Sequence, residues 1–243
     1  MAPIVWRKIL KDTLIKIFVG WDSREDLAFQ VCKQSILDRA KFPNSIEIIP
    51  IKMQEMRDRG LYWRDEDKLA STEFTFTRFL IPELTNFEGW AVFMDCDMIL
   101  TTDIKELFDQ ADPKYAVMCV QHDYKVTEST KMDGQKQTIY PRKNWSSMVL
   151  WNCGHPSNAV VTQDFVNDTE LNGAYMHRFS WLKDEEIGSI NHTWNYLVGV
   201  YNDIEKPKLI HYTEGGPWFE NYRDCEFHAE WKTELYNMME DQI

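Results

Sequence analysis

The sequence predicts an α/β fold in a single domain, and one observation supports each part of this prediction. Short apolar runs of strand length alternate along the 243 residues with longer amphipathic stretches of helix length. No internal repeat, low-complexity tract or linker divides the chain, so we expect one domain over residues 1–243. Hydrophobic residues make up 44% of the sequence, which is enough to build a sizeable core.

The first half of the chain alternates predicted strands with predicted helices. Leu14–Gly20 is an apolar run typical of a buried strand, and the Trp21-Asp22-Ser23-Arg24 segment after it is a turn and helix-start signal. Asp26–Arg39 has the apolar spacing of a helix, and Phe74–Leu84 has it again. Met53–Lys68 is polar and predicts irregular structure. The further strands expected here are Ile46–Ile51, Trp90–Met94 and Tyr115–Val120.

The second half is harder to assign from local pattern. Ser147–Trp151 and Lys208–His211 are short apolar runs that predict strands, and Asn158–Asn172 predicts a helix. His122–Lys143 is polar, and a loop of this length is often functional. Tyr222–Met239, near the C-terminus, is amphipathic and acidic.

Charge and cysteine content exclude several classes of partner. The 27 Lys and Arg oppose 39 Asp and Glu, which gives a formal net charge of −12. Such a surface repels phosphate backbones, so nucleic acid is not an expected partner. No apolar run approaches the roughly 20 residues of a membrane span, and residues 1–13 do not resemble a signal peptide. Five cysteines without a C-x-x-C motif fit reduced thiols, so we expect a cytoplasmic protein with no transmembrane segment.

The triplet Asp95-Cys96-Asp97 is the first candidate site. It directly follows the apolar run of residues 91–94, so two carboxylates emerge from the carboxyl end of a buried strand, where open α/β sheets bind ligands. Two like charges at such a place are costly unless a cation pairs with them, and oxygen ligands suit Mg²⁺ or Mn²⁺. The alternative is a capped strand end in which Asp97 accepts backbone hydrogen bonds, and the residues alone favour neither. The second such triplet, Asp65-Glu66-Asp67, has no strand before it and reads as a solvated loop.

A second candidate site is the segment His211-Tyr212-Thr213-Glu214-Gly215-Gly216-Pro217-Trp218, which follows a short apolar run. Paired glycines let a backbone approach a ligand closely, and an imidazole beside carboxylates would favour Mn²⁺ over Mg²⁺. The alternative is a loop with a hydrogen-bonded histidine and a core tryptophan, which is the more common situation for single residues of these types.

Taken in order, these segments resemble the GT-A glycosyltransferases of glycosyltransferase family 8, which include glycogenin and bacterial lipopolysaccharide glycosyltransferases. The pattern is most similar to a less-characterised group found in bacteria and their viruses, and it runs from about Ile15 to Trp231. The stretches that carry it are STEFTFTRFLIPEL, GWAVFMDCDMIL, YAVMCVQHDY, KNWSSMVLWNC, WNYLVG and LIHYTEGGPWFENYRDCEF.

The resemblance implies a single GT-A domain with a central, mostly parallel twisted sheet flanked by helices, as in Rossmann-like folds. It implies a retaining, metal-dependent glycosyltransferase that moves a hexose from a nucleoside diphosphate sugar to an acceptor hydroxyl, on a glycan or another molecule. UDP-glucose and UDP-galactose are the expected donors, and Mn²⁺ is the expected cofactor, with Mg²⁺ as the alternative. The acceptor would contact variable loops, here His122–Lys143 and the region of Tyr175–Trp181.

The resemblance also implies roles for individual residues. The implied metal ligands are Asp95, Asp97 and His211. The implied nucleotide-sugar site consists of Gly20, Trp21, Asp22, Arg78, Asp95, Cys96, Gly215, Gly216 and Trp218. The carboxylates implied near the reacting sugar carbon are Asp184, Glu185 and Glu186.

Three departures from the family pattern affect these roles. Gly216 stands where the family often has a lysine that meets the diphosphate, so Arg78, Arg142, Lys143 or Arg223 would have to supply positive charge. Trp145-Ser146-Ser147 replaces an Asn-Ser-Gly strand. Glu185 replaces the glutamine of an Asp-Gln pair, which leaves the group at the sugar face open.

Two other classes remain as alternatives. A sugar-nucleotide pyrophosphorylase or nucleotidyltransferase would also hold a metal with carboxylates. Such an enzyme would need a glycine-rich basic loop after the first strand, where this chain has the sequence GWDSRED. A catalytically silent carbohydrate-binding module would explain an aromatic content of 14% but not the metal triplet together with His211.

Overall fold

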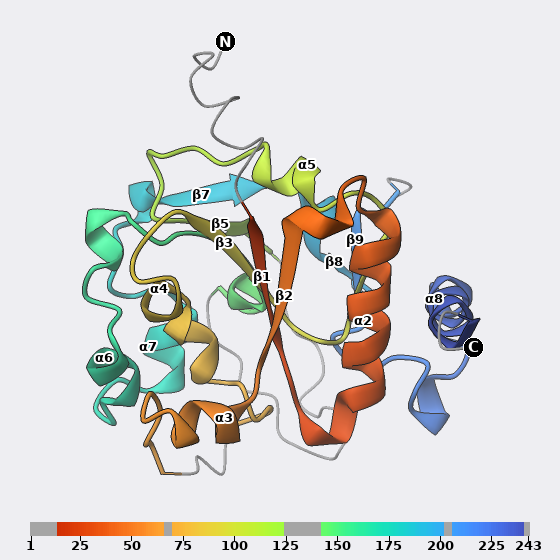
Figure 1. Ribbon diagram of the computed structural model, residues 1–243, viewed down its shortest axis with the longest axis horizontal. Helices are drawn as coiled ribbons and strands as arrows, with labels where there is room; N and C mark the ends of the chain where they lie inside the picture. Colours follow the sequence, from red (N-terminus) through yellow and green to blue (C-terminus); the bar gives the residue numbers. More distant parts are fainter. Residues whose placement is uncertain (1–13, 66–69, 124–141, 202–205, 241–243) are drawn as a thin grey trace.

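The fold is given by a computed structural model that describes residues 14–65, 70–123, 142–201 and 206–240. Its centre is a six-stranded sheet in the order β2-β1-β3-β6-β5-β7, beside which lies a three-stranded sheet in the order β4-β9-β8 (Figure 1). The strands of the central sheet are β1 Ile15–Gly20, β2 Ile46–Ile51, β3 Trp90–Met94, β5 Val117–Val120, β6 Met148–Asn152 and β7 Ile187–Ile190. Those of the small sheet are β4 Met98–Leu100, β8 Tyr196–Leu197 and β9 Leu209–His211.

The central sheet is mostly parallel, which confirms the predicted fold class. β1 pairs in parallel with β2 and β3, and β5 pairs in parallel with β7, while β6 runs antiparallel to both of its neighbours. Five strands therefore point the same way, and the direction of the strands turns progressively from β2 to β7 (Figure 1). As a result, the segments that follow β1, β3 and β5 and the segment that precedes β6 meet at one edge of the sheet.

Helices flank the sheet. They are α2 Asp26–Arg39, α3 Met53–Asp58, α4 Ile81–Leu84, α5 Lys105–Phe108, α6 Gln163–Asn167, α7 Gly173–His177 and α8 His228–Glu240. α2 forms as predicted: Phe29 and Ile36 pack into the main core and Val31 into a second cluster with Trp231, while Leu27 in its first turn is exposed. α8 lies beside α2 (Figure 1), where Arg39 pairs with the buried carboxylate of Glu234.

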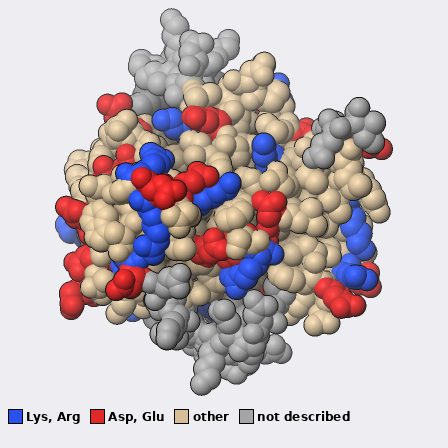
Figure 2. Space-filling view, turned by 60° about the horizontal axis from the view of Figure 1, so that its bottom comes forward, with Lys and Arg blue, Asp and Glu red and all other residues tan. Residues whose placement is uncertain are grey.

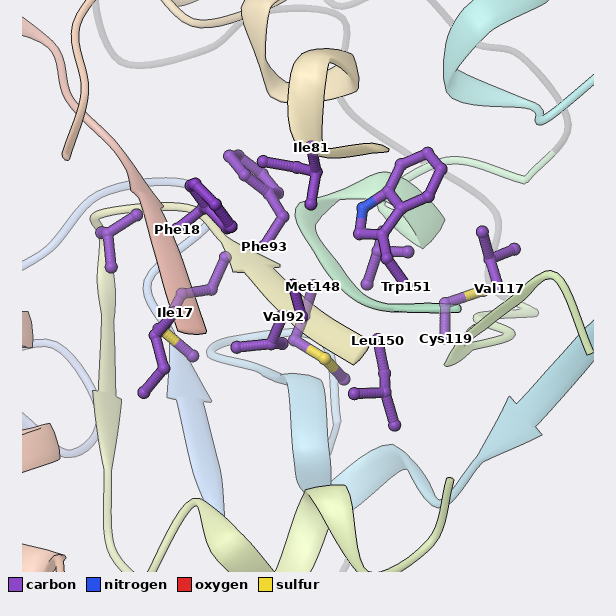
Figure 3. Packing of buried hydrophobic residues seen from close by; sticks show 14 of the residues in the cluster. Ile17, Phe18, Ile81, Val92, Phe93, Val117, Cys119, Met148, Leu150 and Trp151 are labelled. Carbon is purple, nitrogen blue, oxygen red and sulfur yellow. The ribbon is translucent and has the colours of Figure 1, made fainter. Parts of the chain in front are cut away.

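The hydrophobic core is formed by the central strands and the helices that cover them. Phe18, Phe93 and Trp151 come from three strands of the central sheet, are at most 1% exposed, and face Ile81 of α4, whereas Ile17 and Val92 point to the opposite face of the sheet (Figure 3). Burying a side chain of this size contributes about 1.5–3 kcal/mol of transfer free energy. The packed sheet therefore provides a rigid support for the loops at its carboxyl edge.

Several predicted elements need correction. Met53–Lys68 is not irregular throughout, because α3 forms at its start. Phe74–Leu84 is helical only from Thr77, as a 3-10 turn over Thr77–Leu80 followed by α4, because Pro82 suits the first turn of a new helix. Of Asn158–Asn172, Gln163–Asn167 forms an α-helix and only Asn158 belongs to the short 3-10 turn before it.

The remaining boundaries shift by one or two residues. β5 begins at Val117 rather than Tyr115, and β6 covers Met148–Asn152 rather than Ser147–Trp151. Most of the predicted loop His122–Lys143 lies outside the described residues. Among the helices of the described ranges, none combines the length and the apolar character needed to cross a membrane.

Candidate metal and nucleotide-sugar site

Asp95, Asp97 and His211 come together because of how the two sheets join. Asp95, Cys96 and Asp97 connect the end of β3 to the start of β4, and β4 pairs antiparallel with β9 so that Met98 lies opposite His211. The backbone N–H of Tyr212 donates to the carbonyl of Asp97 at 3.0 Å, which extends this pairing by one step. The small sheet thus carries a histidine from late in the chain to the carboxylates that follow β3.

The chemistry of this donor set fits a divalent cation. One ligand atom from each of the three residues lies within 4.8 Å of the others, and His211 Nε2 is 3.4 Å from Asp97 Oδ2. His211 is 2% exposed and Asp97 18% exposed, so the group is sheltered but reachable. Two carboxylates and an imidazole suit Mn²⁺ better than Mg²⁺, which prefers oxygen ligands alone.

Arg78 contributes positive charge to the same place. Its Nη1 donates to Asp95 Oδ1 at 2.8 Å and to the carbonyl of Ser146 at 3.1 Å. Its guanidinium lies over the rings of Phe74 and Phe93, at 5.0 Å from each centroid. This residue, predicted to face the donor, is therefore fixed against the first carboxylate of the triplet.

Glu25 belongs to the same acidic group, although sequence reasoning missed it. It lies in the 3-10 turn Ser23–Glu25 that follows β1, where Cys96 Sγ is 3.7 Å from Glu25 Oε2. Burial, followed by the charges of Asp97 and Asp22, raises the pKa of Glu25 to about 8. The Cys96 thiol is 1% exposed, and burial together with Glu25 and Asp97 raises its pKa well above the usual range. The side chain of Cys96 is therefore a neutral packing group.

The end of β1 is shaped by close packing and by an internal ion pair. A Cβ atom on Gly20 would lie 2.4 Å from the ring of Phe74, so only glycine fits. Asp22 is fully buried and accepts hydrogen bonds from Arg24 and from the backbone N–H of Glu73. Burial raises the pKa of Asp22, but these hydrogen bonds outweigh burial and leave the pKa below its usual value. Asp22 therefore holds the loop in shape.

A cavity of about 610 Å³ adjoins this loop. Its walls include Trp21 and Arg24, which follow β1, and Lys52, which follows β2. Glu73, which precedes the 3-10 turn Thr77–Leu80, also lines it. The Lys52 ammonium lies 5.0 Å from the centroid of the Trp21 ring. Figure 2 brings the carboxyl edge of the sheet forward and shows acidic and basic side chains interspersed there.

The segment after His211 is also shaped by packing. Gly215 has a φ of 134°, which favours glycine, and a Cβ on Gly216 would lie 1.8 Å from the ring of Trp218. Trp218 in turn packs on Tyr212 and Trp231, with centroid distances of 5.9 and 5.5 Å. The paired glycines thus let the backbone fold tightly over Trp218, next to His211.

The three carboxylates predicted near the reacting sugar carbon directly precede β7 in the sequence. Asp184, Glu185 and Glu186 form a 3-10 turn directly before β7, and the carbonyl of Glu186 accepts from the N–H of Ala116 just before β5. The backbone of this turn therefore lies at the amino end of both strands. The side chain of Asp184 is 84% exposed and pairs with Arg142, which precedes β6.

Glu186 has contacts typical of a structural residue. Its carboxylate accepts from the hydroxyl of Ser157 and from the backbone N–H of Lys183, and these hydrogen bonds lower its pKa. Of the second acidic triplet, only Asp65 lies within the described residues.

The sequence of the chain is similar to those of two known proteins. No family model matches. The chain is 56% identical over 225 residues to Protein CDI of Arabidopsis thaliana, covering 90% of this chain and 85% of that protein. It is 26% identical over 216 residues to general stress protein A of Bacillus subtilis (strain 168), covering 76% of this chain and 75% of that protein.

Several solved structures of glycosyltransferases have the same fold. GlyE of Streptococcus pneumoniae TIGR4 superposes with a TM-score of 0.61 at 17% identity, and the alignment covers 92% of this chain but only 60% of GlyE. The galactosyltransferase LgtC superposes with a TM-score of 0.54 at 11% identity over 92% of this chain and 95% of LgtC. Mouse xyloside xylosyltransferase 1 superposes with a TM-score of 0.55 at 14% identity over 84% of this chain and 99% of that one.

These similarities establish the fold as that of the GT-A glycosyltransferases, while membership in glycosyltransferase family 8 and in a bacterial and viral group stays a prediction. The relative with 56% identity, from a plant, establishes the family. The chain belongs to the same family as Protein CDI of Arabidopsis thaliana.

Proposed function

We propose that this protein is a metal-dependent glycosyltransferase that transfers a hexose from a nucleoside diphosphate sugar to an acceptor hydroxyl with retention of configuration. The observation that carries the proposal is the group of Asp95, Asp97 and His211 at the carboxyl edge of a GT-A sheet. Carboxylate oxygens and an imidazole nitrogen gathered in this way suit Mn²⁺, and Mg²⁺ is the alternative.

The residues around this group have complementary roles in the proposal. A bound divalent cation would offset the negative charge that develops on the leaving diphosphate. Arg78 holds Asp95 in place and brings a buried positive charge to the same side of the sheet. Gly215 and Gly216 keep the backbone after His211 compact, so that its N–H groups can lie close to the diphosphate.

The nucleotide is proposed to lie toward the end of β1. The cavity beside Trp21 has a volume suited to a nucleoside, and Lys52 and Arg24 line it. UDP is the expected nucleotide, and glucose or galactose the expected sugar. Asp22 would act by shaping this wall, since its carboxylate is buried in hydrogen bonds to the chain.

Release of UDP tests the proposal directly. The purified protein is incubated with UDP-glucose or UDP-galactose in Mn²⁺, in Mg²⁺ or in EDTA, and free UDP is measured. We expect Mn²⁺-dependent release through slow transfer to water, its loss in Asp97→Ala, and no change in Asp109→Ala, which removes an exposed acid remote from the site. Full release in EDTA would exclude the metal-dependent mechanism.

The same assay separates the alternative classes. A carbohydrate-binding module releases no UDP with any donor. A pyrophosphorylase would instead form a nucleotide sugar from a nucleoside triphosphate and a sugar phosphate, with release of pyrophosphate. The acceptor can then be sought by the increase in UDP release that candidate glycans cause.

A further inference from the structure

A chain of hydrogen bonds lies behind His211, on the side of the ring away from Asp97. His211 Nδ1 is 2.8 Å from Asn195 Oδ1, and Asn195 Nδ2 is 2.8 Å from Ser147 Oγ and 3.3 Å from the backbone carbonyl of Asn144. The Ser147 hydroxyl is itself 2.7 Å from that carbonyl. His211 is 2% exposed, Ser147 3% and Asn195 0%, so water does not compete for these contacts.

The backbone carbonyl of Asn144 fixes the direction of every hydrogen bond in the chain. A carbonyl can only accept, so the Ser147 hydroxyl donates to it, and Ser147 Oγ is left to accept from the Asn195 amide. The reverse orientation of Asn195 would set its oxygen 3.3 Å from another carbonyl oxygen, with no hydrogen between them. Asn195 therefore presents its oxygen to His211.

The consequence is a defined tautomer of His211. Because Asn195 Oδ1 only accepts, the proton of the neutral ring lies on Nδ1, and the lone pair of Nε2 faces Asp97 Oδ2 across 3.4 Å. Two electron pairs that face each other at this distance repel each other unless a proton or a metal cation lies between them. The arrangement matches the outer partners of metal-bound histidines, which receive the other ring N–H and hold the ring in place.

We propose that Asn195, held by Ser147 and the carbonyl of Asn144, is a positioning residue that keeps Nε2 of His211 available to a divalent cation. This inference rests on the metal site of the proposed function. It adds the residues that fix the tautomer and the orientation of His211 in the metal-free protein. Asn144 has a φ of 62°, a left-handed conformation, so the carbonyl that sets the chain's direction is presented by an unusual backbone turn.

The tautomer can be measured without any metal. In a long-range ¹H–¹⁵N correlation spectrum of ¹⁵N-labelled protein in EDTA, at a pH where the ring is neutral, the His211 signals are assigned by their loss in His211→Gln. We expect a protonated Nδ1 and a bare Nε2. A ring protonated on Nε2, or an even mixture, would overturn the inference, whatever the protein's activity.

Metal affinity gives the second test. Asn195→Ala should weaken Mn²⁺ binding about 10- to 100-fold, as measured from the electron paramagnetic resonance of free Mn²⁺. Asn158→Ala is the matched control, because Asn158 is also 0% exposed and donates to two backbone carbonyls, but it lies at the opposite end of β6. The control should lower the melting temperature and leave Mn²⁺ affinity unchanged.

The outcomes separate the inference from the proposed function. If the wild type binds no Mn²⁺, the proposed function fails while the tautomer measurement still decides the role of Asn195. If Asn195→Ala is folded and binds Mn²⁺ like the wild type, the inference fails and the proposed function stands. If Asn195→Ala does not fold, Ser147→Ala replaces it, since losing the acceptor for Asn195 Nδ2 should also weaken Mn²⁺ binding.

Discussion

Arg78 and Asp95 form an ion pair of 2.8 Å in which the guanidinium is 6% exposed and the carboxylate 15% exposed. The pair lies between the aromatic core and the acidic site, since the guanidinium packs over Phe74 and Phe93 while the carboxylate belongs to the candidate metal site. A buried charge that loses its partner is costly, so this arginine supports both the fold and the site.

Replacing Arg78 by alanine should therefore destabilise the metal-free protein strongly. Removing the guanidinium that compensates the sheltered Asp95 charge should lower the free energy of unfolding by on the order of 3 kcal/mol, as measured by urea denaturation in EDTA. Saturating Mn²⁺ should recover part of the loss, because a bound cation also compensates Asp95. Lys105→Ala, which breaks an exposed pair with Asp109, is the control and should cost about 1 kcal/mol or less.

Replacing Asp97 by asparagine should separate metal binding from stability. The Asp97 charge opposes ionisation of Glu25, so Asp97→Asn should be at least as stable as the wild type in EDTA. Mn²⁺ should raise the melting temperature of the wild type but not that of the variant, because a ligand that binds only the folded state stabilises it. An equal shift in both proteins would place the metal elsewhere.

The raised pKa of Glu25 predicts a pH dependence of stability. Its pKa is about 8 in the folded state, against 4.5 as the ordinary value, so the folded state binds more protons than the unfolded state between these limits. Stability should therefore fall as the pH rises from about 4.5 to about 8. Urea denaturation in EDTA at several pH values should show this fall in the wild type and a smaller one in Glu25→Gln.

Glu55→Gln provides the control for that measurement, because Glu55 lies on α3 with an exposed side chain and carries the same change of charge. If Glu25→Gln and Glu55→Gln follow the wild-type pH profile equally, Glu25 does not sense the charges of the site.

The glycine beside Trp218 gives a fourth prediction. A Cβ on Gly216 would overlap the Trp218 ring, so Gly216→Ala should displace the ring, change tryptophan fluorescence and weaken UDP-sugar binding. Gly173→Ala in α7 is the control, because its Cβ would meet nothing closer than 3.8 Å. Binding of UDP by calorimetry distinguishes the two, and wild-type affinity in a folded Gly216→Ala would show that this segment does not contact the nucleotide.

The sequence predicted the parts of the fold whose signal is local. β1, β2, β3 and α2 are long enough for their apolar spacing to identify them, and their boundaries agree with the prediction to within one residue. β4, β8 and β7 were missed, because β4 and β8 have three and two residues and β7 contains Gly188 and Ser189. Such strands exist because partners from elsewhere in the chain pair with them.

The residues of the candidate site also divide into those with a local sequence signal and those without one. Asp95 and Asp97 could be recognised because they directly follow a buried strand, and His211 because the segment around it resembles a known pattern. Glu25 and Asn195 carry no such signal. Glu25 reaches Cys96 from the turn after β1, and Asn195 reaches His211 from a turn before β8, so only the folded chain brings them to the site.

The three carboxylates before β7 give the last prediction. Glu186→Ala should lower the free energy of unfolding by about 1 kcal/mol, because it removes the carboxylate that caps the turn through the N–H of Lys183. UDP release should stay within about two-fold of the wild type, since a group that acts in proton transfer would cost 10²-fold or more. The matched variants Asp184→Asn and Glu185→Gln probe the remaining two carboxylates, which are exposed and therefore contribute little to stability.

A loss of about 10²-fold in turnover with unchanged donor affinity is the result expected of whichever of these two acts on the sugar. Asp184→Asn also breaks the pair with Arg142, so Arg142→Gln is measured beside it. If Arg142→Gln reproduces the loss, the pair acts by positioning the segment before β6. If both Asp184→Asn and Glu185→Gln keep full turnover, the amino end of β7 takes no part in catalysis, and the reacting group must be sought at the carboxyl edge, beside Asp95 and His211.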